Sequence, residues 1–347
     1  MASPAGMVSS LRITILARAQ KFEAIICTHQ VSGAGFAGMM IFMSLADPSE
    51  PISDAKDVIE TIQVSDIIAS WKSDFGIDVA HLFAGVDGLN VVQDPVTGRL
   101  GFYPPIEGDA GFYQALRKFD WYHPPHKEEF AAAAAWHQAG EPVLDIGAGD
   151  ADFSNYIPHQ DYRGLELDGA AVAKAKANGL DVLDLSMQDY LASETFELAG
   201  LVTAFQVLEH VADPDRFISE MAAMTRTGGR VAIGVPDAGS YVADLPDFML
   251  NAPPHHLTWW TEAALEAAMT RAGFEIEAVY RFAVEPWERQ LWWMAQLAKL
   301  GRGDQAARFG AGLRARKVAS YIGSWVLQVF PIPKRVRGST LLIIGKV

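Results

Sequence analysis

Short apolar runs and segments of helical periodicity alternate from residue 142 to the C-terminus. This alternation is typical of a parallel sheet whose two faces are both covered by helices. The pattern predicts an α/β fold built on a seven-stranded, mostly parallel sheet. The expected strands are 142–146, 162–167, 181–184, 199–205, 229–235, 274–282 and 339–346, and the expected helices are 169–178, 214–226 and 261–272.

The chain before this region has a different pattern. Apolar residues recur at helical spacing over 52–71, and residues 75–105 are typical of short strands joined by turns. Aromatic and apolar residues also recur at helical spacing ahead of the last strand. The expected organisation is a small N-terminal α+β cap at 47–124, a main domain at 125–347 and, inside that domain, a helical insertion at about 287–336.

The first 46 residues continue neither pattern. Basic residues precede an uncharged run at 31–46, which is shorter than the about 20 apolar residues that a membrane span needs. A secretory signal and an extension upstream of a start near Met43 are further interpretations, and we expect a poorly ordered extension. Gly33, Gly35 and Gly38 have the spacing of a dinucleotide-binding loop, but no second strand ending in an acidic residue follows.

The charge of the chain narrows the classes of partner. A formal net charge of −14 argues against nucleic acid, because binding to phosphates depends on Lys and Arg. Residues 281–347 nevertheless carry a charge of +9, which suits peripheral contact with anionic lipid, an acidic substrate or a solvated helix face. Cys27 is the single cysteine, so no intrachain disulfide can form. We therefore expect a cytoplasmic protein, with membrane-peripheral contact through the basic segment as an alternative.

A glycine turn follows the first strand of the main domain. Asp145, Gly147 and Gly149 place backbone where a ligand can approach closely. Asp152 stands where a dinucleotide site has its third glycine, and a carboxylate there would repel a pyrophosphate. Glu166 ends the next strand, where it can accept hydrogen bonds from both hydroxyls of a ribose. The loop therefore favours a cationic nucleoside over a dinucleotide.

These motifs, taken in order, resemble the class I S-adenosylmethionine-dependent methyltransferases. Within that class they are similar to the group of ubiquinone-pathway O-methyltransferases and small-molecule and glycan methyltransferases. The resemblance rests on blocks at 143–153, 164–168, 205–214, 228–233, 253–261 and 272–274. It implies a Rossmann-like domain with S-adenosylmethionine as cofactor. The cofactor contacts it implies are Asp145, Gly147, Gly149, Glu166, Leu167, Ser186, Met187 and Gln206.

The spacing Gln206-x-x-Glu209-His210 with the distant His256 resembles the divalent-cation site of plant small-RNA 2′-O-methyltransferases and ubiquinone-pathway relatives. The resemblance implies Glu209, His210 and His256 as metal ligands. Gln206 departs from the family pattern, which has a carboxylate there, and this weakens a site for a hard cation. A structural Glu209–His210 pair is the alternative. His256 and, second, His255 are candidate general bases, because imidazole titrates near neutrality.

We therefore expect methyl transfer from S-adenosylmethionine, with oxygen as the first choice of acceptor atom. The acceptor would be a small molecule or a glycan or lipid-linked compound. A non-catalytic S-adenosylmethionine-binding regulator or assembly protein is the main alternative, and a flavin or nicotinamide enzyme using Gly33 to Gly38 is another.

Overall fold

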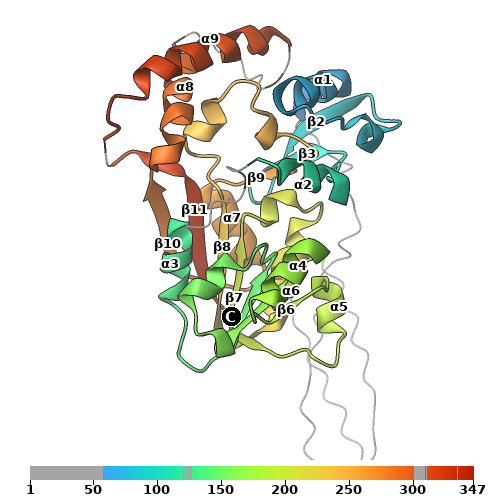
Figure 1. Ribbon diagram of the computed structural model, residues 1–347, viewed down its shortest axis with the longest axis vertical. Helices are drawn as coiled ribbons and strands as arrows, with labels where there is room; N and C mark the ends of the chain where they lie inside the picture. The colour runs from blue at the N-terminus through green and yellow to red at the C-terminus, as the bar shows by residue number, and fades with distance from the viewer. Residues whose placement is uncertain (1–57, 120–121, 123–126, 301–308, 310, 334) are drawn as a thin grey trace, which may run out of the picture. The chain divides into compact units, whose positions relative to one another are not determined.

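The computed structural model describes residues 58–119, 122, 127–300, 309, 311–333 and 335–347 of the chain (Figure 1). These residues all belong to one compact unit, 52–347. The expectations for residues 1–46, including the Gly33 to Gly38 motif and Cys27, lie outside the described residues.

A seven-stranded sheet has the order β10-β11-β8-β7-β4-β5-β6. Strands β4 to β8 run parallel, and β11 is antiparallel to both of its neighbours, β8 and the edge strand β10. The predicted α/β fold with a mostly parallel sheet is confirmed. The strands are β4 (Val143–Ile146), β5 (Tyr162–Leu165), β6 (Val182–Leu183), β7 (Ala199–Phe205), β8 (Thr225–Pro236), β10 (Glu275–Ala283) and β11 (Arg337–Lys346).

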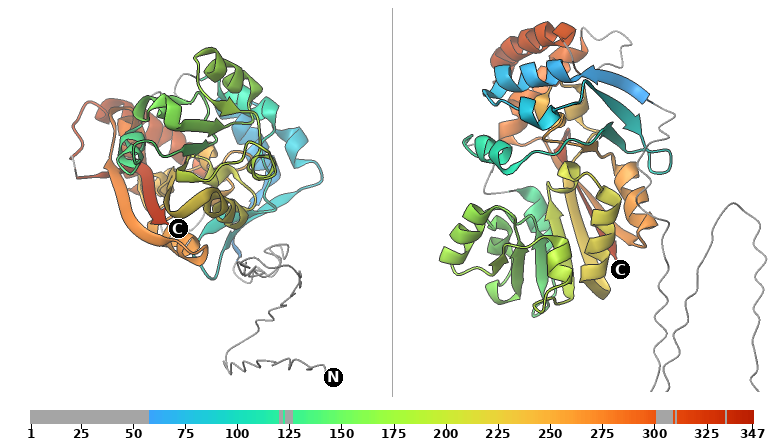
Figure 2. Two further views of the ribbon diagram at one scale, coloured as in Figure 1. Left: turned by 90° about the horizontal axis from the view of Figure 1, so that it is seen from below. Right: turned by 90° about the vertical axis from the view of Figure 1, so that its right-hand side faces the viewer.

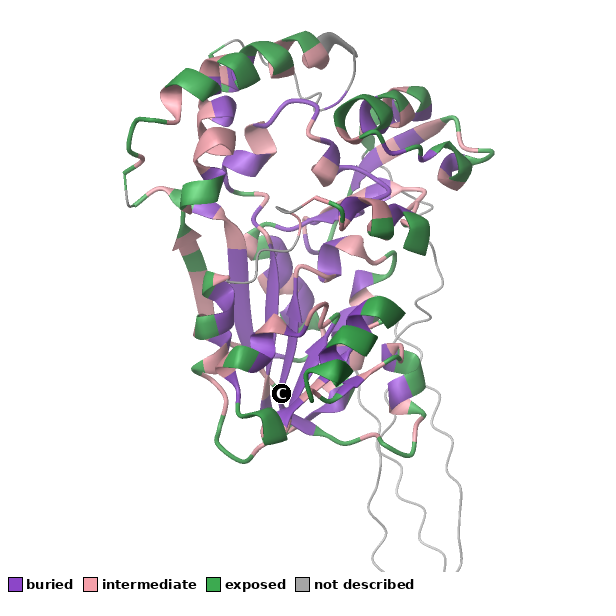
Figure 3. Cartoon of the chain, in the orientation of Figure 1, coloured by how far each residue is buried: buried purple, intermediate pink, exposed green. Residues whose placement is uncertain are grey.

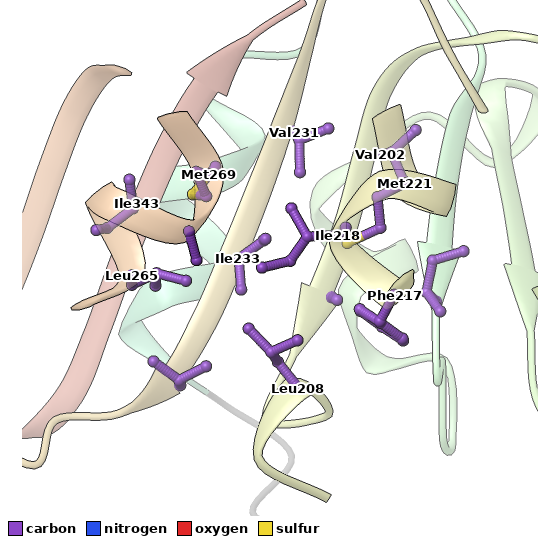
Figure 4. Close-up of a cluster of buried hydrophobic side chains, with 14 of the residues drawn as sticks. Val202, Leu208, Phe217, Ile218, Met221, Val231, Ile233, Leu265, Met269 and Ile343 are labelled. Carbon is purple, nitrogen blue, oxygen red and sulfur yellow. The ribbon is translucent and has the colours of Figure 1, made fainter. Parts of the chain in front are cut away.

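Helices cover both faces of this sheet, as the alternating pattern predicts (Figures 1 and 2). Every residue of β7 is buried, so the strand presents apolar side chains to both faces. On one face, Ile218 and Met221 pack near Val231 and Ile233 (Figure 4). The helices of that face are α5 (Met187–Leu191), α6 (Pro214–Met224) and α7 (Glu262–Arg271), and α3 (Glu128–Ala134) and α4 (Gly169–Ala177) pack on the other.

A second, four-stranded sheet has the order β1-β2-β3-β9. Its elements are β1 (Val58–Gln63), α1 (Val64–Phe75), β2 (Gly88–Gln93), β3 (Leu100–Tyr103), α2 (Ala110–Leu116) and β9 (Thr258–Trp259). The helix expected over 52–71 is wrong at 58–63, where the chain is a strand because it pairs with β2. The sheet also takes β9 from beyond the boundary expected at residue 124.

Two helices lie between β10 and β11, where the helical insertion is expected. They are α8 (Arg289–Lys299) and α9 (Ala311–Leu327), and they pack against each other. The buried Glu288 carboxylate anchors the start of the insertion, because it accepts hydrogen bonds from the Tyr241 hydroxyl at 2.9 Å and the Ser339 backbone N–H at 2.8 Å. None of the described helices is long and apolar enough to cross a membrane.

Candidate active site

The loop after β4 is shaped by two glycines in the left-handed region. Gly147 has φ +66° and Gly149 has φ +56°. A Cβ atom on Gly147 would lie 2.6 Å from a methyl carbon of Val207, so only glycine fits there. A Cβ atom on Gly149 would have no heavy atom within 4 Å, so the loop faces open space at that point. Gly147 therefore sets the approach of the loop to the turn after β7, and Gly149 leaves room for a ligand.

Glu166 at the end of β5 holds this loop. Its Oε2 accepts a hydrogen bond from the Gly149 backbone N–H at 2.7 Å. Its Oε1 accepts from the N–H groups of Leu167 and Asp168, each at 2.8 Å. A carboxylate offers about four lone-pair sites, so three are already occupied and one remains on Oε2. The expectation that Glu166 accepts from two ribose hydroxyls at once therefore requires the loop to release a backbone N–H.

The Arg117 side chain reaches this region from the end of α2. Its guanidinium lies 2.9 Å from Asp168 Oδ2 and 3.9 Å from Asp150 Oδ1. Asp150 also binds Lys174 of α4 at 2.8 Å. Arg117 thus connects the glycine loop, the end of β5 and α2. Sequence reasoning missed Arg117, because its partners are about 33 and 51 residues away.

Asp145 lies within the sheet. The carboxylate is buried and accepts hydrogen bonds from the hydroxyls of Thr203 at 2.7 Å and Tyr162 at 3.0 Å. These partners belong to β7 and β5, the two strands beside β4. Burial raises the pKa of Asp145 to about 7, although both hydrogen bonds lower it. The side chain therefore joins three strands, β4, β5 and β7.

Three further expected contacts lie near the ends of β5 and β6. Leu167 is largely exposed. Ser186 caps α5, because its hydroxyl accepts from the Asp189 backbone N–H at 3.1 Å. Met187 is buried in the core cluster on the sheet face that α5, α6 and α7 cover. The backbone brings the two strand ends together, since the Glu166 N–H donates to the Leu183 carbonyl at 3.0 Å.

Gln206 follows β7 with φ +59°, which is unusual for a residue other than glycine. Its amide Nε2 donates a hydrogen bond to Glu129 Oε1 at 3.2 Å, and its backbone N–H donates to the Gly234 carbonyl at 2.8 Å. Glu129 is buried on α3, and burial raises its pKa. The family pattern has a carboxylate at position 206, where this chain has Gln206. Glu129 therefore supplies a carboxyl group next to the Gln206 side chain. Sequence reasoning missed it, because an acidic residue in the first turn of a helix is ordinary.

Glu209 and three histidines meet beside this turn. Glu209 and His210 lie in a 3₁₀ turn after β7, and His255 and His256 precede β9. His210 Nε2 is 3.7 Å and His256 Nε2 is 4.0 Å from Glu209 Oε1. Ring nitrogens of all three histidines lie within 4.8 Å of one another. The predicted group Glu209, His210 and His256 is thus brought together, and His255 joins it.

The Glu209 carboxylate lacks the partners that a buried carboxylate needs. Both oxygens are buried, and neither has a hydrogen-bond partner among the described residues. Burial raises the pKa of Glu209 to about 8, and it lowers the pKa of His210 to about 4. Burial also lowers the pKa of His255 and of His256 well below the usual value. The imidazoles are therefore neutral at physiological pH and offer nitrogen lone pairs.

Hydrogen bonds distinguish the three imidazoles. His210 Nδ1 donates to the His255 carbonyl at 2.6 Å, so its Nε2 keeps a lone pair. His256 Nδ1 lies 3.2 Å from Asn251 Oδ1, an acceptor, so its Nε2 also keeps a lone pair toward Glu209. Both nitrogens of His255 are engaged.

His255 is held from two sides. Its Nδ1 donates to the Leu250 carbonyl at 2.8 Å, and its Nε2 accepts from the Tyr122 hydroxyl at 3.0 Å. The rings of Tyr113 and Phe112 of α2 and Trp71 of α1 pack around it. Tyr122 and Asn251 were missed by sequence reasoning, since their contacts depend on the packing of the four-stranded sheet against the strand ends.

The glycine loop and the histidine group share one turn, residues 206–210. Val207 packs against Gly147, and Glu209 and His210 follow directly. Both lie at the carboxyl ends of the parallel strands β4, β5 and β7, where open α/β sheets bind their ligands. The arrangement can therefore hold a nucleoside at the loop and a reacting group beside the histidines.

A family model described as a methyltransferase domain matches residues 121–279 of this chain. With the strand order and the glycine loop, this match and the relatives described below support a class I S-adenosylmethionine-dependent methyltransferase, with S-adenosylmethionine as its cofactor.

The chain is similar to a ubiquinone biosynthesis O-methyltransferase of Xanthomonas axonopodis pv. citri, with 26% identity over 48% of this chain and 75% of the relative. It is also similar to a probable S-adenosylmethionine-dependent methyltransferase of Mycolicibacterium smegmatis, with 29% identity over 40% of this chain and 54% of the relative. Among solved structures, a SAM-dependent methyltransferase of Archaeoglobus fulgidus matches with a TM-score of 0.44 and 16% identity, covering 68% of this chain and 100% of that one.

Proposed function

We propose that this methyltransferase transfers the methyl group to a hydroxyl oxygen of a small-molecule, glycan or lipid-linked acceptor. The Xanthomonas relative is named an O-methyltransferase, which supports oxygen as the acceptor atom. The observation that carries the proposal is the group of neutral imidazoles around the buried carboxyl group of Glu209, beside the glycine loop. A hydroxyl must lose a proton when it is methylated, and such a group can take it.

The cofactor is expected at the glycine loop. Gly147 and Gly149 let its backbone come close, and Glu166 has one free lone pair for a ribose hydroxyl. Bound S-adenosylmethionine supplies an electrophilic methyl group on a sulfonium. The carboxyl group of Asp152 at the loop suits a cationic ligand, whereas Asp150 is paired with Lys174. We therefore propose that Gly147, Gly149 and Glu166 form the nucleoside end of the pocket.

His256 is the proposed general base. Its Nε2 keeps a lone pair, whereas both nitrogens of His255 are already hydrogen-bonded. The Asn251 side-chain oxygen accepts a hydrogen bond from His256 Nδ1. This contact leaves His256 Nε2 as the nitrogen that accepts the proton. His255 is then a positioning residue, because its carbonyl accepts the hydrogen bond of His210.

The donor set also fits a divalent cation. His210 Nε2, His256 Nε2 and Glu209 Oε1 converge, and the two buried oxygens of Glu209 lack hydrogen-bond partners among the described residues. Nitrogen and carboxylate donors together suit zinc, manganese or iron better than magnesium. A cation bound by these residues would lower the pKa of an acceptor hydroxyl and orient it. In that case His256 would serve as a ligand, and the role of base would pass to another group.

The two roles of His256 can be separated by experiment. Release of S-adenosylhomocysteine is measured with hydroxylated aromatic, glycan and lipid-linked acceptors, with chelator and with added Zn²⁺ or Mn²⁺. Activity that survives chelation but is lost in His256→Ala supports the base. Activity that requires the cation and is lost equally in His256→Ala and Glu209→Gln supports the metal site. Methylation found only at nitrogen or carbon would contradict the proposal.

A further inference from the structure

Helix α9 exposes an apolar face. Its outward residues follow one another at spacings of three and four, so they form a continuous stripe along one side of the helix and the turn after it. Their exposed fractions lie between 47% and 73%. In Figure 3 the ribbon of α9 is coloured mainly as exposed or intermediate. The stripe consists of Val318, Tyr321, Ile322, Trp325, Val326, Val329 and Phe330.

The inner side of the same helix is polar. Ser320 and Ser324 are buried, and their hydroxyls donate to carbonyls of the helix itself at 2.9 and 2.7 Å. Gly323 faces Leu297 of α8, where a Cβ atom would clash. α9 therefore buries its small polar residues and exposes its large apolar ones. This is the reverse of a helix that packs its apolar face on a protein core.

The charges of α9 hold the helix in this orientation. Arg314 lies 3.8 Å from carboxylate oxygens of both Asp66 and Asp247. Lys317 pairs with Asp74 and donates to the Asp247 carbonyl at 2.8 Å. These contacts join α9 to α1 and to the segment before β9. The outward orientation of the stripe is thus specified by ion pairs on its other side.

The sequence that contains the stripe is basic. From Gln305 to Val347 the sequence has eight Lys and Arg residues and no Asp or Glu, in a chain whose net charge is −14. Arg335 and Arg337 follow the stripe directly and are exposed. A second copy of this chain would bring two such basic segments together, and their repulsion disfavours it. A surface of negative charge is the complementary partner.

We propose that the apolar face of α9 binds an anionic lipid surface, with the helix axis parallel to the membrane. A helix of 17 residues is about 26 Å long, and none of the described helices is long and apolar enough to cross a bilayer. Trp325 and Tyr321 lie within the stripe, and such side chains favour the level of the lipid headgroups. Arg335 and Arg337 then meet the headgroup phosphates.

The test is cosedimentation of the full chain with vesicles, compared between phosphatidylcholine alone and an equal mixture with phosphatidylglycerol. We expect binding to the mixed vesicles, and a loss of at least about tenfold in the partition coefficient in Ile322→Asp/Val326→Asp. Val96→Asp is the matched control, because Val96 is 70% exposed and lies outside the basic segment. Calorimetric titration with S-adenosylhomocysteine checks that each variant is folded.

Three results would overturn the proposal. The first is absence of binding to mixed vesicles, and the second is equal binding of the stripe variant and the wild type. The third is a dimer in sedimentation velocity that the stripe variant dissociates, because a second copy would then cover the face. Binding that is equally strong to phosphatidylcholine alone, or unchanged in Arg335→Glu/Arg337→Glu, would refute the part assigned to charge. None of these measurements depends on methyl transfer.

Discussion

Glu166→Gln tests the cofactor pocket most directly. An amide keeps the size of the side chain but replaces one acceptor oxygen by an NH₂ donor. If the amide oxygen stays beside Leu167 and Asp168, the NH₂ group faces the Gly149 N–H, and that hydrogen bond is lost. The opposite placement loses two. The first placement is therefore favoured, and it also turns a donor toward the open side of the loop, where the ribose is expected.

The magnitude follows from these contacts. A hydrogen bond to a charged group contributes about 1.5–3 kcal/mol, so the loss of the ribose contact alone weakens binding about 10- to 150-fold. Loosening of the loop at Gly149 adds to this loss. We expect the Kd for S-adenosylhomocysteine, measured by calorimetry, to rise by at least about tenfold in Glu166→Gln.

A matched control comes from the exposed Glu194 on the same domain. Glu194→Gln removes the same charge at a distance from the loop and should leave the Kd unchanged. A Kd within about twofold of the wild type in Glu166→Gln would refute the placement of the ribose at Glu166.

Four further results are expected. Gly147→Ala should lower the free energy of unfolding in urea by about 1–3 kcal/mol, because its Cβ meets Val207 at 2.6 Å; an unchanged midpoint would contradict that packing. Asp145 has a pKa raised from 3.8 to about 7, so the folded state holds its proton while the unfolded state ionises. Stability should therefore fall as pH rises from about 4 to 7, and between pH 5 and 8 wild type should lose about 3 kcal/mol more than Asp145→Asn; parallel curves would refute this. His256→Ala should lower kcat about 10²- to 10⁴-fold with little change in the Kd for S-adenosylhomocysteine, and a kcat equal to that of wild type would exclude it as base or ligand. In Glu209→Gln the Kd for Zn²⁺, measured by competition with a chromophoric chelator, should rise at least about tenfold, and an unchanged Kd would place the cation elsewhere.

Local patterning was enough to predict the main sheet. The parallel strands β4 and β7 are apolar runs buried on both faces, so their side chains leave a signal that needs no knowledge of neighbours. The caps of α6 and α7 are local as well: the carboxylate of Asp213 and the hydroxyl of Thr261 each accept a backbone N–H of the helix that follows. The spacing of Gly147, Gly149 and Glu166 could likewise be read from the sequence without knowledge of tertiary contacts.

The errors arise where contacts are distant in sequence. Residues 58–63 were expected to be helical, but pairing with β2 makes them a strand. The hydrogen bonds of Asp145 show the same limit, because Thr203 and Tyr162, which hold its carboxylate within the sheet, are 58 and 17 residues away in the sequence. A sequence motif identifies the residue type at a position. It does not show which neighbouring strands donate hydrogen bonds to that residue.

The sequence alone determined the class of the fold, the glycine loop and the set of candidate histidines, because these depend on periodicity and on short spacings. Only the tertiary structure decided that His256 keeps a free nitrogen while His255 does not, since Tyr122 and Asn251 reach them from other elements. It also decided that the apolar side of α9 faces outward, because the ion pairs that orient the helix span about 70 to 250 residues of chain. Such contacts form only when the chain has folded.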